Sequence, residues 1–233
     1  RLLRRLRSLI GEPAQAVILP FVTTQLEARL AIELGVPIYG ADPRLEAIGS
    51  KTGSREVFAS AGVPHPRGAA GVHTVSDVVE VVAQLRSGPN PPDGVVVKHD
   101  VGVSGGGNAM VDLRDAESGD RADLAARVQC LRPEDPDLDV EAYLEQLDRE
   151  GGVVEERIVG EHFCSPSVQL RASPEGGIEV LTTHDQVLGG ESGQTYYGCR
   201  FPAAPAYAPV IADHAVAIAG ELSRQGVVGR FGV

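Results

Sequence analysis

Hydrophobic and polar positions follow strand and helix periods in turn along the first part of the chain. Short apolar runs, typical of buried parallel strands, lie at residues 16–20 and 36–40. Between them, Leu26, Leu30 and Leu34 fall on one helical face, and a glycine and a proline follow. This strand–helix–strand order predicts an open α/β domain.

Five helical patterns follow along the chain. The first begins after Ser50, a suitable N-cap, and ends at Gly62. The second, "SDVVEVVAQLR", is predicted to be capped by Ser76. Two more, between about residues 119 and 149, are separated by the prolines of "RPEDPD", which exclude one continuous helix. A long final helix is predicted to end at Gly226.

Strand patterns dominate the segment after residue 151. "SVQLRA" and "IEVLTT" flank the turn "SPEGG", which predicts an antiparallel hairpin, and "TYYGCRFPA" is a further strand candidate. "GVVGRFGV" has the pattern of a strand in which the sequence stops. Because native domains seldom end inside a buried strand, we expect this sequence to be a fragment.

Composition limits the classes of function. The chain has 233 residues, 42% hydrophobic and 23% charged, which is enough to bury a core. Its net charge of -11 argues against a nucleic-acid partner bound by a broad basic surface. No apolar run reaches about 18 residues, so no membrane span is expected. The widely spaced Cys130, Cys164 and Cys199 favour a reducing, cytoplasmic location.

The segment "GVVVKHDVGVSGGGNAMV", residues 94–111, carries the strongest chemical signal. Strand alternation places Lys98 on the same face as Val96, and a glycine-rich loop follows. Such a loop lets backbone N–H groups converge on an anion, so lysine and loop are a candidate phosphate clamp. A flexible turn with a surface lysine is the alternative. GxxxxGK[ST] and GxGxxG are absent, which excludes a P-loop and a Rossmann dinucleotide site.

The order of these features resembles the ATP-grasp superfamily. A helix led by Lys51, "AGVPHP", "VVVK", the glycine loop, two helices and "VVEERIVGE" follow one another. "GADPRLEAIGSKTGSREVFASAGVPHP" and "THDQVLGGESGQTYYGCRFPA" further resemble peptide ligases of the pheganomycin type. The resemblance implies an α/β ATP-grasp fold of α+β subdomains, truncated at its C-terminus and preceded by the end of a Rossmann-like domain. Residues 1–48 would close that domain, 49–157 form the small lid subdomain with its linking helix, and 158–233 the large subdomain.

The resemblance also assigns residues to the nucleotide. Lys51 and Lys98 match two lysines that contact ATP phosphates, and Lys98 and Arg230 are the catalytic candidates. Arg230 matches an arginine that stabilises the transferred phosphate and the tetrahedral intermediate. The flap over the phosphates would comprise Gly102, Ser104, Gly105, Gly106 and Gly107. The hinge that reads the adenine edge would comprise Glu155, Glu156 and Ile158, followed by the ribose carboxylate Glu161, for which His162 is the alternative.

The substrate side is less defined by the sequence. Arg200 in "GCRFPA" is a candidate for holding a substrate carboxylate, because a guanidinium binds one bidentately. A structural ion pair is the alternative for Arg200. Asp185 and Gln186 are further substrate-site candidates. The family's magnesium ligands would lie beyond Val233, so this chain by itself is not expected to turn over.

The activity that the resemblance implies is an ATP-dependent carboxylate–amine, or peptide, ligase of specialised biosynthesis. It would use Mg²⁺, proceed through an acyl-phosphate and release ADP and phosphate. Its substrates would be a small amino-acid-like carboxylate and an amine or peptide acceptor. Two alternatives stay open: an ATP-grasp carboxylase or thioester-forming ligase, and a nucleotide-binding module without activity. The substrates and the oligomeric state also stay open, a homodimer being one option.

Overall fold

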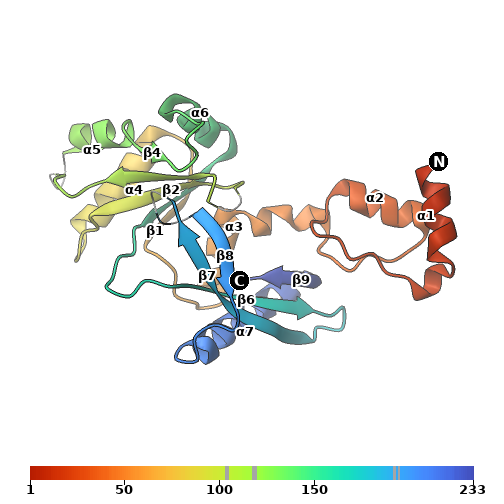
Figure 1. The fold of residues 1–233 in the computed structure, drawn as a ribbon. Coiled ribbons are helices and arrows are strands. Elements are labelled where there is room, and N and C mark those ends of the chain that lie inside the picture. Colours follow the sequence, from red (N-terminus) through yellow and green to blue (C-terminus); the bar gives the residue numbers. More distant parts are fainter. Residues whose placement is uncertain (103–104, 117–119, 191–192, 194) are drawn as a thin grey trace.

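The computed structural model describes residues 1–102, 105–116, 120–190, 193 and 195–233, which form two lobes and an N-terminal arm, residues 1–49 (Figure 1). Each lobe is a sheet with helices packed on it, and the arm projects away from both (Figure 1). The helices are α1 Leu2–Ile10, η1 Pro13–Gln15, α2 Gln25–Leu34, η2 Pro43–Gly49, α3 Lys51–Ser60, α4 Val75–Ser87, α5 Arg121–Val128, α6 Val140–Glu150 and α7 Ala208–Arg224. The strands are β1 Gly68–Val72, β2 Gly94–His99, β3 Asn108–Asp112, β4 Arg132–Pro133, β5 Gly152–Glu156, β6 Ser165–Ala172, β7 Ile178–Gly189, β8 Thr195–Arg200 and β9 Gly229–Gly232.

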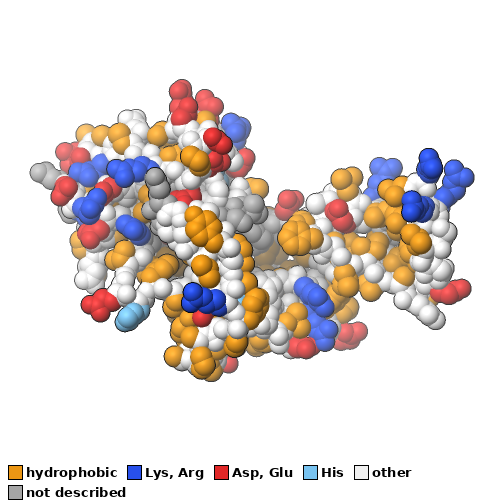
Figure 2. All heavy atoms as spheres, in the orientation of Figure 1, with side chains coloured by type: hydrophobic (Ala, Val, Ile, Leu, Met, Phe, Trp, Pro, Cys, Tyr) orange, Lys and Arg blue, Asp and Glu red, His pale blue; other side chains and the backbone are white. Residues whose placement is uncertain are grey.

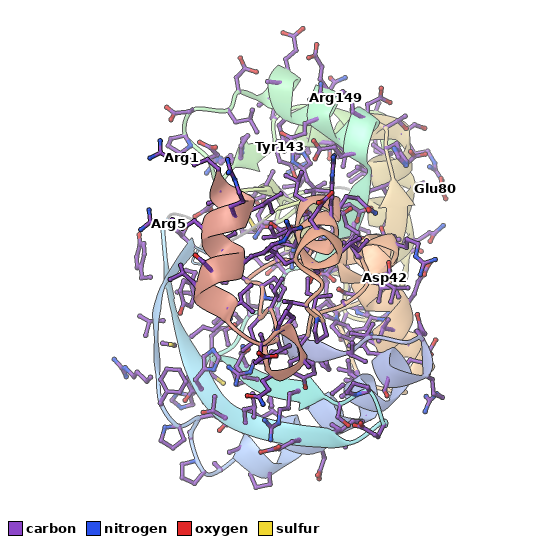
Figure 3. All side chains as sticks on the ribbon, turned by 90° about the vertical axis from the view of Figure 1, so that its right-hand side faces the viewer. Arg1, Arg5, Asp42, Glu80, Tyr143 and Arg149 are labelled. Atoms are coloured by element: carbon purple, nitrogen blue, oxygen red, sulfur yellow. The ribbon has the colours of Figure 1, made fainter. Side chains whose placement is uncertain are left out.

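The N-terminal arm has the predicted helix but only a trace of the predicted strands. Ile18 and Ile38 form a single parallel bridge, and no longer ladder occurs among the described residues of the arm. Leu19 is 58% exposed, so no packed layer covers this segment, and an isolated strand pair is marginal in water. The arginines of α1 gather at the end of the arm (Figure 2), and Arg1 and Arg5 extend outward from this helix (Figure 3).

The first lobe is a five-stranded antiparallel sheet in the order β1-β5-β2-β3-β4. Helices α4, α5 and α6 supply residues to a core on one face of this sheet. The strands contribute alternate residues to that core, so the residues between them face the other side. Core members include Val78, Val82, Val95, Val97, Val111, Leu113, Leu124, Leu131, Tyr143, Leu147 and Val154.

The structure confirms one of the two predicted helix N-caps and contradicts the other. The prediction for α3 is confirmed, because the Ser50 hydroxyl accepts the N–H of Gly53 at 3.0 Å. The prediction for α4 is wrong, because Thr74 and not Ser76 is the N-cap. Thr74 accepts the N–H of Asp77 at 3.1 Å, and the Asp77 carboxylate accepts the N–H of Thr74 at 2.8 Å. This reciprocal capping box satisfies two N–H groups, which Ser76, inside the first turn, does not do.

The second lobe is a four-stranded antiparallel sheet in the order β8-β7-β6-β9. Strands β6 and β7 form the predicted hairpin, in which Ala172 pairs with Ile178. Helix α7 packs on this sheet around a small core of Val168, Leu170, Ala215 and Ala219. Residues 157–164 connect β5 to β6 as an exposed segment without helix or strand. The domain boundaries at 48/49 and 157/158 stay predictions.

Candidate functional site

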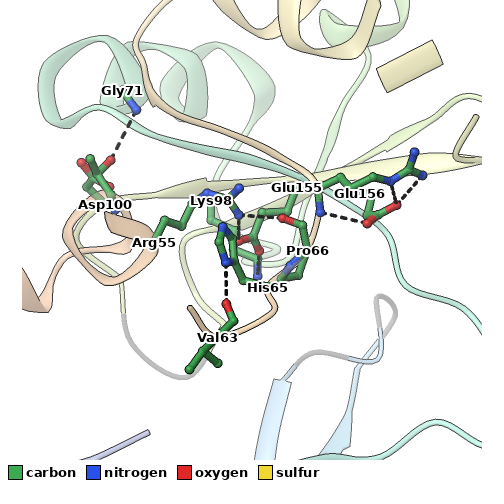
Figure 4. A network of polar contacts seen from close by, with 11 residues as sticks. Arg55, Val63, His65, Pro66, Gly71, Lys98, Asp100, Glu155 and Glu156 are labelled. Carbon is green, nitrogen blue, oxygen red and sulfur yellow. Dashed lines mark hydrogen bonds and ion pairs between the residues drawn. The ribbon is translucent and has the colours of Figure 1, made fainter. Parts of the chain in front are cut away.

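Strand pairing in the first lobe places Lys98 beside Glu155. Val95 and Val97 are in the core, so Val96 and Lys98 face the opposite side of the sheet. In the β2–β5 ladder Val96 pairs with Glu155, which makes Lys98 and Glu155 diagonal neighbours on that side. Lys98 Nζ donates to Glu155 Oε2 at 2.7 Å (Figure 4).

Glu155 has a second cationic partner from α3. Arg55 Nη1 donates to Glu155 Oε1 at 2.6 Å and to the carbonyl oxygen of Pro66 at 3.0 Å (Figure 4). The side chains of Arg55 and Glu155 are only 10% and 11% exposed. Burial by itself would raise the pKa of Glu155, but Lys98 and Arg55 together lower it below its ordinary value. Glu155 is therefore a carboxylate at neutral pH.

Lys51 approaches the same region from the first turn of α3. Its Nζ donates to the carbonyl oxygen of Gly102 at 3.4 Å. Burial, and next the positive charge of Lys98, lower the pKa of Lys51, while Glu155 and Asp100 act in the opposite direction. Two lysines that repel each other in a half-buried position form an electropositive place, which an anion would stabilise.

Asp100 ties the start of the glycine loop to α3. Its Oδ1 accepts the N–H of Thr52 at 2.8 Å, and its carbonyl oxygen accepts the N–H of Lys51 at 3.3 Å. Its own N–H donates to the carbonyl oxygen of Gly151 at 3.0 Å. The residue that follows β2 thus satisfies the free N-terminal N–H groups of the helix that carries Lys51.

A cavity of about 120 Å³ brings the two lysines and the glycine loop together. Its lining consists of Lys51, Lys98, His99, Gly102, Gly105, Gly107 and Asn108. Two predicted phosphate lysines and three of the predicted loop glycines therefore meet at one place. Gly106 lies in the same turn, and Ser104 is outside the described residues. The arrangement can neutralise and enclose a small anion such as a phosphate group.

Two residues that the sequence analysis missed hold the base of this loop. The N–H of His99 and the hydroxyl of Tyr143 approach the Gly107 carbonyl oxygen at 2.9 and 3.0 Å. The Tyr143 hydroxyl also lies 2.9 Å from the carbonyl oxygen of Val97, and its ring stacks on His99 at 4.0 Å. His99 directly follows Lys98 in the sequence, but no sequence signal pointed to Tyr143 on α6.

The remaining residues of the predicted hinge lie at and beyond the end of β5. The Glu156 carboxylate accepts the Arg67 N–H at 2.8 Å and pairs with its guanidinium at 2.6 Å, while the Glu156 N–H donates to the Arg67 carbonyl oxygen (Figure 4). Ile158, Glu161 and His162 lie exposed in the connection between the lobes. The structure thus brings Glu155, but not these exposed residues, into contact with a lysine of the cavity, Lys98.

A separate pocket of about 510 Å³ in the second lobe contains the three predicted substrate residues, Asp185, Gln186 and Arg200. Asp185 is engaged internally, because it accepts the Tyr207 hydroxyl at 2.6 Å and the N–H of Ala204 at 3.0 Å. Gln186 accepts the Ser165 hydroxyl at 3.1 Å. Within the described part of the chain Arg200 makes no ion pair.

Arg230 is not placed at the lysine cavity. It is exposed on β9 and lines a third cavity of about 710 Å³. The other walls of this cavity include Tyr39 and Asp42 of the arm and Phe58 of α3. The structure therefore distributes the predicted lysines and loop glycines, the substrate residues and Arg230 over three separate cavities, and the predicted hinge residues line none of them.

Comparison with known proteins decides the fold. No family model matches the chain. Over 237 aligned residues it is 33% identical to L-propargylglycine–L-glutamate ligase of Streptantibioticus cattleyicolor, covering all of this chain and 47% of that protein. The biotin carboxylase domain of Hydrogenobacter thermophilus 2-oxoglutarate carboxylase superposes with a TM-score of 0.64 at 19% identity, covering 99% of this chain and 47% of that one. D-alanyl-alanine synthetase A of Vibrio cholerae gives 0.58 at 13% identity, covering 93% and 61%. The chain has the ATP-grasp fold.

The similarity to these two structures confirms the predicted ATP-grasp fold class, and the two sheets with their helices confirm its mixed α/β architecture. It is homologous to the propargylglycine–glutamate ligase and spans about half of that relative's length. Over the described residues, none of the helices combines the length and apolar character needed to cross a bilayer. Nor do those residues contain a group of three or more His, Cys, Asp or Glu side chains that could hold a metal ion.

Proposed function

We propose that the protein carrying this ATP-grasp chain is an ATP-dependent ligase that joins a carboxylate to an amine. The observation that carries the proposal is the cavity where Lys51 and Lys98 meet the glycine loop. Homology to a ligase whose name joins two amino acids supports an amino-acid-like carboxylate and an amine or peptide acceptor as substrates. The free cysteines agree with a cytoplasmic reaction.

The proposed chemistry converts a poor acylating agent into a reactive one. A substrate carboxylate oxygen attacks the γ-phosphorus of ATP, which forms an acyl-phosphate and releases ADP. The amine then attacks the acyl carbon, loses a proton, and expels inorganic phosphate. Lys51 and Lys98 neutralise the phosphate charge, and the glycine loop covers an intermediate that water would hydrolyse. Mg²⁺ would screen the phosphates further, but the described residues supply no carboxylate cluster for it, so no step is assigned to it.

The nucleotide base would lie along the end of β5. Glu155 and Ile158 are proposed to face the adenine edge, and Glu161, or His162 one residue on, the ribose. Because the N–H of Glu156 is already bonded to Arg67, only the Glu156 carbonyl oxygen would be free to read adenine. The direct continuation of β5 into the exposed segment 157–164 supports this order of contacts.

The carboxylate substrate is proposed to bind Arg200 in the pocket of the second lobe, with Gln186 beside it. Asp185 would act through Tyr207 and Ala204, since both of its oxygens are occupied there. Arg230 is proposed to stabilise the transferred phosphate and the tetrahedral intermediate. Since Arg230 lines another cavity here, this role requires the phosphate chain to extend from the lysines toward β9.

The test is product analysis with the full-length protein. ATP, Mg²⁺ and pairs of amino acids should yield ADP and phosphate only when both a carboxylate and an amine substrate are present. Lys98→Ala should abolish this release, whereas Arg121→Gln, in an exposed ion pair with Glu80, should not change it. AMP and pyrophosphate as products would contradict the acyl-phosphate route. A requirement for bicarbonate or coenzyme A would favour another ATP-grasp class, and nucleotide binding without any turnover would favour an inactive module.

A further inference from the structure

Glu155 has two cationic partners that differ in what they can do next. Lys98 is 22% exposed and lines the lysine cavity, so its ammonium can turn toward a ligand there. Arg55 is 10% exposed, does not line that cavity, and is also anchored to the carbonyl oxygen of Pro66 at 3.0 Å. A ligand phosphate can therefore compete with Glu155 for Lys98 but not for Arg55.

This competition would endanger Glu155 if it had a single partner. A carboxylate at 11% exposure that loses its cation next to an arriving phosphate is a buried, uncompensated charge. Such a group does not stay ionised, because it takes up a proton instead. The protein would then have to bind a proton whenever it bound a nucleotide.

We propose that Arg55 is a positioning residue for nucleotide binding: it keeps Glu155 ionised and in place while Lys98 moves from Glu155 to a nucleotide phosphate. The inference rests on the proposed function of the lysine cavity. Arg55 touches neither the nucleotide nor the reacting atoms, and it acts through Glu155. A guanidinium suits this task because it stays charged at every pH at which the protein is folded.

Among the described residues, only Lys98 and Arg55 form ion pairs with Glu155, and the nearby Lys51 lines the lysine cavity, where the phosphate itself would bind. On β1 the residue opposite Glu155 is Gly68, and on β3 the residues across from Lys98 and Val96 are Asn108 and Met110. Other charged or titratable groups near Glu155 are bonded elsewhere: Lys51 to Gly102, Arg67 to Glu156, and Asp100 to Thr52. His65 is bonded to the carbonyl oxygen of Val63 (Figure 4). When Lys98 leaves, Arg55 remains the close counter-charge.

The test measures protons taken up on nucleotide binding. The full-length protein is titrated calorimetrically with the non-hydrolysable analogue AMP-PNP and Mg²⁺, between pH 6 and 8, in buffers of different ionisation enthalpy. Arg55→Gln should take up close to one proton more per nucleotide than the wild type. Its affinity should gain up to about tenfold per pH unit on acidification, relative to wild type, which is the limit for one linked proton.

Three variants separate positioning from a merely structural role. Arg55→Lys should restore most of the wild-type pH profile, because it keeps a cation beside Glu155. The double variant Arg55→Gln with Glu155→Gln should lose the extra proton, because no carboxylate remains at position 155. It also serves if Arg55→Gln alone folds poorly, because it leaves no Glu155 carboxylate without Arg55. Arg121→Gln, on an exposed pair, should match wild type.

The outcomes distinguish this inference from the proposed function. If wild type binds AMP-PNP and Arg55→Gln binds it with the same affinity and no extra proton, the inference is overturned alone. The same holds if the double variant keeps the extra proton of the single one, since Glu155 would then not be its source. If wild type itself does not bind AMP-PNP with Mg²⁺, the proposed function fails and the inference fails with it.

Discussion

The carboxylate of Glu155 illustrates how a buried charge depends on its partners. Arg55 and Lys98 lie within 2.7 Å of it, on a helix and on a strand that the sequence separates widely. Arg55 and Glu155 are 100 positions apart in the chain, so no local pattern could pair them. The lysines were predictable because their surroundings carry a family resemblance, whereas the sequence analysis did not single out Arg55.

We predict that Glu155→Gln destabilises the protein by about 3–5 kcal/mol at pH 7, because two half-buried cations lose their counter-charge. The folded state lowers the pKa of Glu155, so its contribution is complete above the ordinary value of 4.5 and is lost as pH falls through the lower, folded pKa. The free energies of unfolding of the wild type and of Glu155→Gln, measured in urea, should therefore differ most at neutral pH and converge in acid. Glu80→Gln, which removes one half of an exposed pair, should cost less than about 1 kcal/mol, and an equal loss in both variants would contradict the argument.

A second prediction concerns the hydroxyl of Tyr143. It is buried, its pKa is raised by burial, and it lies within hydrogen-bond distance of the carbonyl oxygens of Val97 and Gly107. Tyr143→Phe should lower the free energy of unfolding by about 1 kcal/mol, because the hydroxyl's hydrogen bonds are lost while the Gly107 carbonyl oxygen keeps the N–H of His99. Amide exchange at the base of the glycine loop should also become faster. Tyr197→Phe, at a residue 68% exposed, should change neither measurement.

At the scale of elements, the order of helices and strands follows from pattern, but their ends depend on partners. Ser50 caps α3 and Thr74 caps α4. From the sequence, Thr74 and Ser76 were equally suitable caps for α4, because the choice depends on which hydroxyl faces a free N–H. The arm strands at residues 16–20 and 36–40 fail for the opposite reason. Their apolar pattern is correct, but a ladder needs a covering layer, and Leu19 is 58% exposed.

Asp100 joins two elements, and its replacement should affect both. Asp100→Ala removes the acceptor for the N–H of Thr52, which should cost about 1 kcal/mol, and it leaves only the backbone bond to Lys51 between residue 100 and the helix that carries Lys51. We therefore expect weaker binding of AMP-PNP with Mg²⁺ as well as lower stability. Asp120→Ala removes the N-cap of α5 in the same way but lies away from the lysine cavity. It should lower stability to a similar extent and leave nucleotide affinity unchanged; if both variants bind equally well, the coupling through Asp100 is refuted.

Across the whole molecule, the two lobes have separate hydrophobic cores joined by the exposed segment 157–164. The sequence predicted both groups of strands, but it could not place Arg230 relative to Lys98. That relation depends on how two bodies with separate cores settle against each other, which no local pattern specifies. A ligand that contacts β5, the connection and the second lobe would restrain this arrangement.

The connection therefore offers a direct test of nucleotide binding across the lobes. Arg157 is exposed and is followed by seven exposed residues without helix or strand, so trypsin should cut native protein after Arg157. If Ile158 and Glu161 contact the nucleotide, AMP-PNP with Mg²⁺ should slow this cut at least several-fold, because the connection must leave its bound conformation to enter the protease. Cuts among the arginines of α1, at the far end of the arm, should keep their rate (Figure 2). Arg157→Gln should remove the cut altogether and identify the band. Unchanged cleavage after Arg157 at saturating nucleotide would mean that the connection is not part of the binding site.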